Sequence, residues 1–379
     1  MKGYFRKRGT KWSFTVDLGK DPTGKRKQKT MSGFKTKKEA EKSCNELINQ
    51  LNKGTYIEPT EKTVADLLMD WLDLIASQSH RPSTFHNRKD LIKKRIIPAI
   101  GHYKLNKITP EIIQKFYKDM VQGEGLSPDY VRTMHGVLRK VFKQAVIWKL
   151  ISQNTMELVQ PPRIETKDIQ TWSLEEANQF LQHTENERLH IAYVLAIYTG
   201  MRRGEILGLR WRDCDLEQAK VSIRQTLARV DGKLVFQEPK TKGSKRRITI
   251  TEEVISALKK HRSEQNKYKL LLGPGYIDNG LIICTEDGKP IDPRNLLRHF
   301  ARMKKETNVP ELRFHDLRHT HATILLLLGE NPKVVSERLG HSRVDITLDI
   351  YSHVLPDMQE NAANNFEQAM KQKKNDATH

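Results

Sequence analysis

Two arginines, two histidines and a tyrosine in the second half of the chain have the types needed to transfer a phosphodiester: Arg202, His315, Arg318, His341 and Tyr351. Such a transfer builds negative charge on the non-bridging oxygens, and guanidiniums hold those oxygens by forked, permanently charged hydrogen bonds. Arg202 and Arg318 fit that role. A phenol of pKa ~10 is a weak nucleophile at neutral pH unless a base and a positive field assist it. Tyr351 fits the nucleophile, with His315 as its base and His341 as a hydrogen-bond donor to the phosphate.

Four short segments carry these residues, and Tyr351 follows His341 by ten positions. Together they resemble the tyrosine recombinase, or phage integrase, family: Thr199-Gly200-Met201-Arg202-Arg203-Gly204-Glu205, His315-Asp316-Leu317-Arg318-His319, Leu339-Gly340-His341-Ser342 and Leu348-Asp349-Ile350-Tyr351-Ser352-His353. The resemblance is strongest over residues 170–355. It implies a site-specific recombinase that cuts and rejoins DNA through a covalent 3′-phosphotyrosine, as integrases of temperate phages and conjugative transposons do. Because the covalent link stores the energy of the broken bond, we expect no cofactor, metal or ATP.

The resemblance also places a catalytic lysine between the first two segments, where Pro239-Lys240-Thr241 stands on an expected hairpin. The departing 5′-hydroxyl needs a proton, and Lys240 at a mobile hairpin tip is our candidate acid. Lys242 and Lys245 are close competitors.

Other interpretations of these residues are available. The segment 199–205 alone could be a helix break with a surface Arg-Glu pair, and Tyr351 alone a packed surface tyrosine. His315 and His319 would share one helical face and, with His321, could suggest a zinc site. No Glu separates the pair in the metalloprotease manner, and Arg318 would repel a cation while suiting a phosphate. We expect Glu205 to orient a neighbouring arginine.

The composition favours nucleic acid as the partner. The formal net charge is +20, from 66 Lys and Arg against 46 Asp and Glu, and the pI is about 9.7. The longest apolar run, residues 322–328, is far short of the ~20 residues of a spanning helix, and no signal peptide opens the chain. Cys44, Cys214 and Cys284 follow no ligand or disulfide spacing, so we expect a cytoplasmic protein without a membrane partner.

Residues 1–60 form the first of three expected domains, and they carry 15 Lys and Arg against six acids. Alternation around Phe14 and Val16 predicts a small three-stranded antiparallel sheet. A capping box at Thr36 and Glu39 starts a helix that covers one face of the sheet. The resemblance implies an arm-type DNA-binding domain, and four cations could meet phosphates from the free face unless they form a solvated loop: Lys25, Arg26, Lys27 and Lys29.

Residues 61–162 read as a four-helix core-binding bundle, with start signals at Thr63, Ser83, Thr109 and Ser127. A basic ridge suggests that the bundle also lies on DNA; it comprises Lys89, Lys93, Lys94 and Arg95. The stretch 160–163 makes a natural linker.

Residues 163–379 complete a multidomain α+β chain as a mainly helical catalytic domain with a small antiparallel sheet near 219–250 and a tail helix. The tail has an apolar stripe of Met358, Ala362, Phe366 and Met370, which either packs back on its own domain or docks on a neighbouring protomer.

The resemblance implies a homotetramer on core-type and arm-type sites of double-stranded DNA, strand exchange through a Holliday junction and a possible accessory directionality factor. The rival functions are a type IB topoisomerase-like relaxing enzyme and a non-catalytic DNA-binding regulator.

Overall fold

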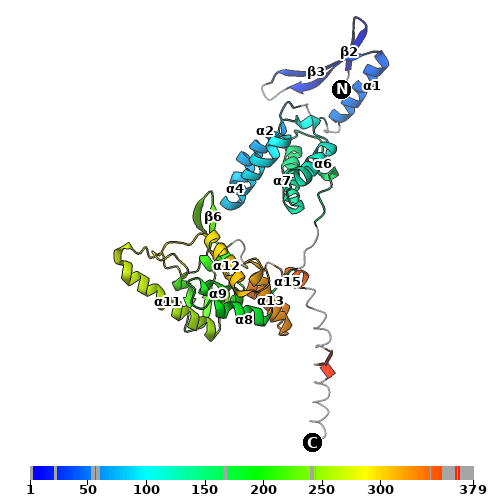
Figure 1. Ribbon diagram of the computed structural model, residues 1–379. Helices are drawn as coiled ribbons and strands as arrows, with labels where there is room; N and C mark the ends of the chain where they lie inside the picture. Colours follow the sequence, from blue (N-terminus) through cyan, green and yellow to red (C-terminus); the bar gives the residue numbers. More distant parts are fainter. Residues whose placement is uncertain are drawn as a thin grey trace. The chain divides into compact units, whose positions relative to one another are not determined.

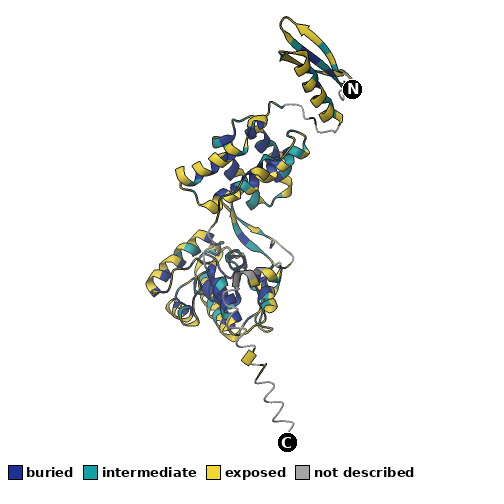
Figure 2. Ribbon diagram, turned by 90° about the vertical axis from the view of Figure 1, so that its right-hand side faces the viewer, coloured by how far each residue is buried: buried dark blue, intermediate teal, exposed yellow. Residues whose placement is uncertain are grey.

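The computed structural model describes residues 3–20, 24–52, 56, 60–164, 169–239, 243, 245–341, 343–351, 363–364 and 366–367. The chain separates into two compact units, Met1–Glu165 and Thr166–His379. No helix in these described stretches is long and apolar enough to cross a membrane. Within each unit the buried residues line the faces that packed elements turn toward one another (Figure 2).

The first unit opens with the expected sheet and helix (Figure 1). Strands β1 (Gly3–Arg8), β2 (Lys11–Lys20) and β3 (Arg26–Phe34) pair antiparallel in that order, and α1 (Lys37–Asn52) packs on them. The predicted capping box is present, because Thr36 Oγ1 accepts from the amide of Glu39 and Glu39 Oε2 accepts from the amide of Thr36. Phe14 and Val16 are buried against α1.

The register corrects one expectation about the basic cluster. Lys29 pairs with Val16, and directly paired residues of an antiparallel ladder point to the same side, so Lys29 lies on the side that α1 covers. Lys27, two positions earlier in β3, shares that side. Arg26 lies on the open side, where its Nε donates to Asp17 Oδ2 at 2.6 Å. Lys25 precedes β3 and is exposed.

The rest of this unit is the expected helical bundle. Four helical rods are formed by α2 (Val64–Trp71) with η1 (Leu72–Ala76) and α3 (Ser77–Ser79); α4 (Pro82–Leu91) with η2 (Ile92–Ile96) and α5 (Ile97–Ile100); α6 (Pro110–Lys118) with η4 (Asp119–Gly123); and α7 (Pro128–Ile147). Single turns at η3 (Leu105–Lys107) and η5 (Thr155–Leu158) complete it. Thr63, Thr109 and Ser127 cap their helices as predicted, whereas the second rod begins at Pro82 rather than after Ser83. Lys89, Lys93 and Lys94 are exposed, and Lys94 pairs with Asp90.

The second unit is mainly helical, as expected, and its strands form two small antiparallel sheets where one was expected. Its helices are α8 (Leu174–His183), α9 (His190–Thr199), α10 (Arg203–Leu207), α11 (Glu252–Leu272), α12 (Pro293–Thr307), α13 (Asp316–Leu327), α14 (Pro332–Leu339) and α15 (Val344–Tyr351), with short turns η6 (Trp211–Asp213) and η8 (Gly273–Gly275). One sheet has the order β4 (Cys214–Asp215), β5 (Lys220–Ser222), β8 (Arg247–Thr249), and the other pairs β6 (Thr226–Val230) with β7 (Lys233–Gln237). Of the expected tail helix only residues 363, 364, 366 and 367 are described, and they are helical.

Helix α9 is the centre of this unit. Every residue from 191 to 197 is buried, which is typical of a helix that is apolar all round and enclosed on every side. Its carboxyl end leads directly into the segment that carries Arg202. The position of α9 therefore fixes where the first candidate arginine stands.

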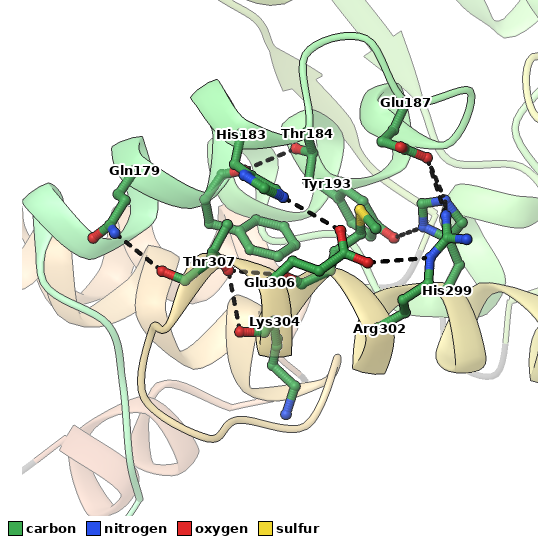
Figure 3. Close-up of polar contacts among 12 residues, drawn as sticks. Gln179, His183, Thr184, Glu187, Tyr193, His299, Arg302, Lys304, Glu306 and Thr307 are labelled. Atoms are coloured by element: carbon green, nitrogen blue, oxygen red, sulfur yellow. Dashed lines mark hydrogen bonds and ion pairs between the residues drawn. The ribbon is translucent and has the colours of Figure 1, made fainter.

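Polar contacts tie α12 to α8 and α9 (Figure 3). His299 Nε2 donates to Glu187 Oε2 at 2.9 Å, and its Nδ1 lies 2.6 Å from the hydroxyl of Tyr193 on α9. On the α8 side, Gln179 Nε2 donates to the carbonyl of Thr307 at 3.0 Å. Helix α12 in turn supplies one wall of a cavity of about 570 Å³ beside Arg202 and His315. The network holds that wall in place.

Candidate active site

Arg318 stands in the first turn of α13 and is almost completely buried, with 3% of its surface exposed. Asp316 fixes the start of this helix, since its Oδ2 accepts from the amide of Arg313 at 2.9 Å. The guanidinium of Arg318 donates from Nη1 to the carbonyl of Gly200 and from Nη2 to the carbonyl of Leu339, both at 2.7 Å. These bonds orient a permanent positive charge inside the unit.

Arg202 lies directly before α10 and is held by Glu205. The carboxylate of Glu205 accepts from the amide of Arg202 and from its Nη1, both at 2.9 Å. Nη2 of Arg202 donates to the carbonyl of Gly340 at 3.3 Å. A third of the side chain, 35%, remains exposed, so an anion can reach it. The expected orienting role of Glu205 is thus supported by its geometry.

The carbonyls that hold the two arginines come from tight helix ends. Gly200 ends α9 with φ +64°, and Gly340 ends α14 with φ +69°, a left-handed conformation that side chains rarely adopt. A Cβ at Gly200 would lie 2.6 Å from Leu339 Cδ2. Glycine at both positions therefore lets α9, α13 and α14 come close enough for the arginines to reach across.

Three histidines surround these charges and are shifted toward the neutral form. Loss of solvation, then the charges of Arg318 and Arg202, lower the pKa of His341 to about 4. The same causes lower the pKa of His315, which lies at the rim of the cavity beside Arg202. Burial and the neighbouring His315 lower the pKa of His319 to about 4. A neutral imidazole can accept a proton at pH 7, which the role assigned to His315 requires.

His321 has both ring nitrogens occupied. Its Nδ1 donates to the carbonyl of Ile197 at 2.8 Å, and its Nε2 accepts from Arg338 Nε at 3.1 Å. Burial, then the charge of Arg338, lower its pKa to about 3. With no lone pair available, His321 cannot complete a zinc site with His315 and His319. Within the described residues no group of three His, Cys, Asp or Glu side chains is arranged to hold a metal ion.

Tyr351 is the last residue of helix α15. One turn earlier on the same helix, Thr347 is fully buried, and its Oγ1 lies 2.8 Å from Nδ1 of His341. This bond joins the helix of the expected nucleophile to the histidine beside the two arginines.

Lys240 lies outside the described residues, as do its competitor Lys242 and the neighbouring Thr241. The β6–β7 hairpin in the described part of the chain turns earlier, at Asp231 and Gly232. Lys240 falls in the connection from β7 to β8, which belong to different sheets. The other competitor, Lys245, pairs with Glu238 at 2.8 Å.

Three residues that the sequence did not single out take part in the site: Arg246, Arg338 and Thr347. Arg246 binds Glu205, and Arg338 donates to the carbonyls of Thr249 and Tyr198 as well as to His321. Arg246 and Arg338 work through partners far away in the sequence, whereas Thr347 contacts His341 six positions earlier, and no local periodicity marks any of these partners. Within the described residues, the structure brings Arg202, His315, Arg318 and His341 together.

Comparison with known proteins identifies this arrangement. The phage integrase family model matches residues 170–358, an arm DNA-binding domain model matches residues 4–51, and a phage integrase N-terminal SAM-like domain model matches residues 63–121. The chain is 34% identical over 367 residues to a XerC-like tyrosine recombinase of Caldanaerobacter subterraneus subsp. tengcongensis, covering 92% of this chain and 93% of that protein. The chain belongs to the tyrosine recombinases of the phage integrase family. It is a site-specific DNA recombinase.

A further relative resembles the chain in sequence, and two solved structures share its fold. The ICEBs1 integrase of Bacillus subtilis is 27% identical over 354 residues, which cover 93% of this recombinase and 95% of that integrase. The fold is also that of the Tn1549 transposon integrase, solved in complex with a circular intermediate DNA, with a TM-score of 0.68 at 22% identity over 80% of this chain and 99% of that one. A lambda integrase dimer bound to a COC′ core site gives a TM-score of 0.57 at 18% identity over 76% and 95% of the two chains.

Proposed function

We propose that this recombinase cleaves DNA by attack of Tyr351 Oη on a phosphodiester held by Arg202 and Arg318. The new O–P bond forms as the bond to the 5′-oxygen breaks, which leaves a 3′-phosphotyrosine and a free 5′-hydroxyl. His315 takes the phenol proton, and Lys240 gives a proton to the departing oxygen. Attack by the 5′-hydroxyl of a partner strand reverses these transfers and rejoins the DNA.

One observation carries this assignment: the two arginines hold the carbonyls of successive residues. Arg318 binds the carbonyl of Leu339 and Arg202 that of Gly340, and His341 follows next in the chain. The charges of both arginines lower the pKa of His341, so both guanidiniums lie close enough to act on this imidazole. Charged donors arranged in advance around one anion stabilise the charge that develops in a transition state.

Neutral histidines suit the two roles we assign them. A neutral His315 can take the proton of the phenol, and a protonated one cannot. His341 keeps one N–H as a donor to the phosphate when its other nitrogen accepts from the hydroxyl of Thr347. Because these histidines are neutral at pH 7, the positive charge around the phosphate comes from the arginines, whose guanidiniums stay protonated at that pH.

We further propose three domains, at residues 1–60, 61–162 and 163–379, and a homotetramer that exchanges strands pairwise between two DNA sites, with an accessory protein setting direction. The separate apolar cores around Phe14 and around Leu67 support the first boundary.

The open side of the first sheet, which includes Tyr4, Arg6 and Arg26, would contact arm-type sites and add avidity to core-site binding. The ends of the element that encodes the chain would be the core sites.

The test of this function is a nicked suicide duplex that carries one end of the element. Wild-type protein should form a covalent protein–DNA adduct, and two marked duplexes should recombine. Adduct formation without any recombinant product would indicate a relaxing enzyme that uses the same chemistry. Specific binding without an adduct would contradict the proposed mechanism.

A further inference from the structure

We propose that Arg246 is a positioning residue of the recombinase, which holds Arg202, through Glu205, in register with the turn that carries His341. This inference rests on the phosphate-binding role proposed for Arg202. It assigns to Arg246 no contact with DNA and no part in proton transfer.

Glu205 is enclosed between the two arginines. Only 4% of the Glu205 side chain and 7% of the Arg246 side chain are exposed. Nη1 of Arg246 donates to Oε1 of Glu205 at 3.2 Å, and Nη2 donates to Oε2 at 3.0 Å. The same two oxygens hold the guanidinium and the amide of Arg202, so the Arg246 fork fixes the carboxylate that fixes Arg202.

The remaining donor of the Arg246 guanidinium, Nε, binds the turn that leads to His341. Nε donates to the carbonyl of Arg338 at 2.6 Å. That carbonyl comes directly before those of Leu339 and Gly340, which hold Arg318 and Arg202. A Cβ on Gly340 would lie 3.0 Å from both Cδ and Nη1 of Arg246, so the turn packs directly on this side chain. One guanidinium thus sets the distance between Glu205 and the turn before His341.

The backbone of Arg246 adds a third connection. Its carbonyl accepts from the amide of Ile223 at 2.9 Å, and β8 begins at the next residue and pairs with β5. Arg246 is also the last residue of the connection from β7 that contains Lys240. Arg246 therefore both anchors the end of this connection and orients Arg202 through Glu205.

Removing these bonds should reduce the rate of cleavage and leave DNA affinity unchanged. A misplacement of about 1 Å at a reacting centre can cost about 100-fold in rate. Lysine keeps a positive charge near Glu205 but lacks the fork that reaches three acceptors at once, so it should restore the function only in part.

The experiment measures single-turnover cleavage of the suicide duplex by the full chain at saturating protein, together with the dissociation constant and the melting temperature. Arg246→Met should cleave about 100-fold more slowly and Arg246→Lys about tenfold more slowly, both with the affinity of the wild type. The double variant Arg246→Met/Glu205→Gln should be no slower than the slower single variant, because both residues act through the position of Arg202. The matched control is Arg247→Met, which changes the exposed next residue and should cleave bound DNA at the wild-type rate.

Cleavage by Arg246→Met within threefold of wild type would overturn the inference, and so would rate losses that multiply in the double variant. If Arg246→Met does not fold, Arg246→Lys decides: a wild-type rate contradicts the inference, and a slower rate at unchanged melting temperature supports it. Arg202→Met separates the two proposals. If it cleaves normally, the phosphate-binding role itself is wrong; if it is inactive while the Arg246 variants are normal, only the present inference fails.

Discussion

Thr347 Oγ1 and His341 Nδ1 lie 2.8 Å apart, within hydrogen-bonding distance, and Thr347 is fully buried. Thr347 belongs to the helix that ends at Tyr351, and His341 follows the turn that binds both arginines. The contact therefore couples the position of the proposed nucleophile's helix to the phosphate site. When the hydroxyl of Thr347 donates to Nδ1, the other ring nitrogen of His341 carries the proton and can donate to a phosphate.

Thr347→Val should slow cleavage about tenfold at unchanged DNA affinity. The substitution keeps the shape of the side chain but removes a hydrogen bond worth ~1 kcal/mol that holds the imidazole of His341 in place. Thr347→Ser retains the hydroxyl and should cleave nearly as fast as wild type. Equal rates for the valine and serine variants, measured by single-turnover adduct formation, would show that the bond plays no part.

Protein stability should fall as the pH drops below about 6.5. Folded His321 stays neutral down to a pKa of about 3, whereas an unfolded histidine takes up a proton near pH 6.5. The unfolded chain therefore binds more protons below pH 6.5, and the stability present above that pH is lost as the pH falls toward 3.

His321→Gln tests the origin of this effect. An amide can accept from Arg338 but does not titrate, so the pH dependence of the unfolding free energy between pH 6 and 4 should become shallower. The change expected is up to one proton, or about 1.4 kcal/mol per pH unit. Urea unfolding at several pH values measures it, and a slope identical to wild type would assign the acid sensitivity to other groups.

Cleavage should persist in excess EDTA. The proposed mechanism places all positive charge on arginine and lysine, so chelation removes nothing that the reaction uses. The measurement is adduct formation after dialysis against chelator, with DNA binding as the control. Activity that disappears and returns specifically with zinc or magnesium would reopen the metal-site interpretation of His315 and His319.

Arg6→Ala should weaken binding to arm-type DNA, whereas Lys29→Ala should not. Arg6 lies two positions after Tyr4, which pairs with Thr15 on the open side of the first sheet, and Lys29 lies on the side covered by α1. Each phosphate contact adds about 0.9 to the slope of log affinity against log salt, so Arg6→Ala should reduce that slope by about this amount. A larger loss for Lys29→Ala would place the DNA on the other side of the domain.

Much of the fold followed from local patterns. The alternation around Phe14 and the capping box at Thr36 predicted the first sheet and its helix, and both are present. The second bundle helix begins at Pro82 rather than after Ser83, because proline is favoured in the first turn of a helix. These features depend on residues within one or two turns of each other.

The sequence alone placed Lys29 on the wrong side of the sheet and did not single out Arg246, because both depend on partners that lie elsewhere in the chain. The side on which Lys29 lies is set by its pairing with Val16, in the stretch between two register shifts of the β2–β3 ladder, and the sequence of β3 does not reveal this pairing. Arg246 stands in a stretch rich in lysine and arginine, where one more cation indicates only a solvated or DNA-facing surface. Its partners lie 41 and 92 positions away, at Glu205 and Arg338, so only the folded chain shows its role.

The central claim is that Tyr351 is the sole nucleophile, and the most direct measurement is covalent adduct formation by Tyr351→Phe on the nicked suicide duplex. The variant should bind core-site DNA with wild-type affinity, because phenylalanine removes only the hydroxyl, and should yield no adduct and no recombinant product. Adduct formation or recombination near the wild-type rate would contradict the mechanism.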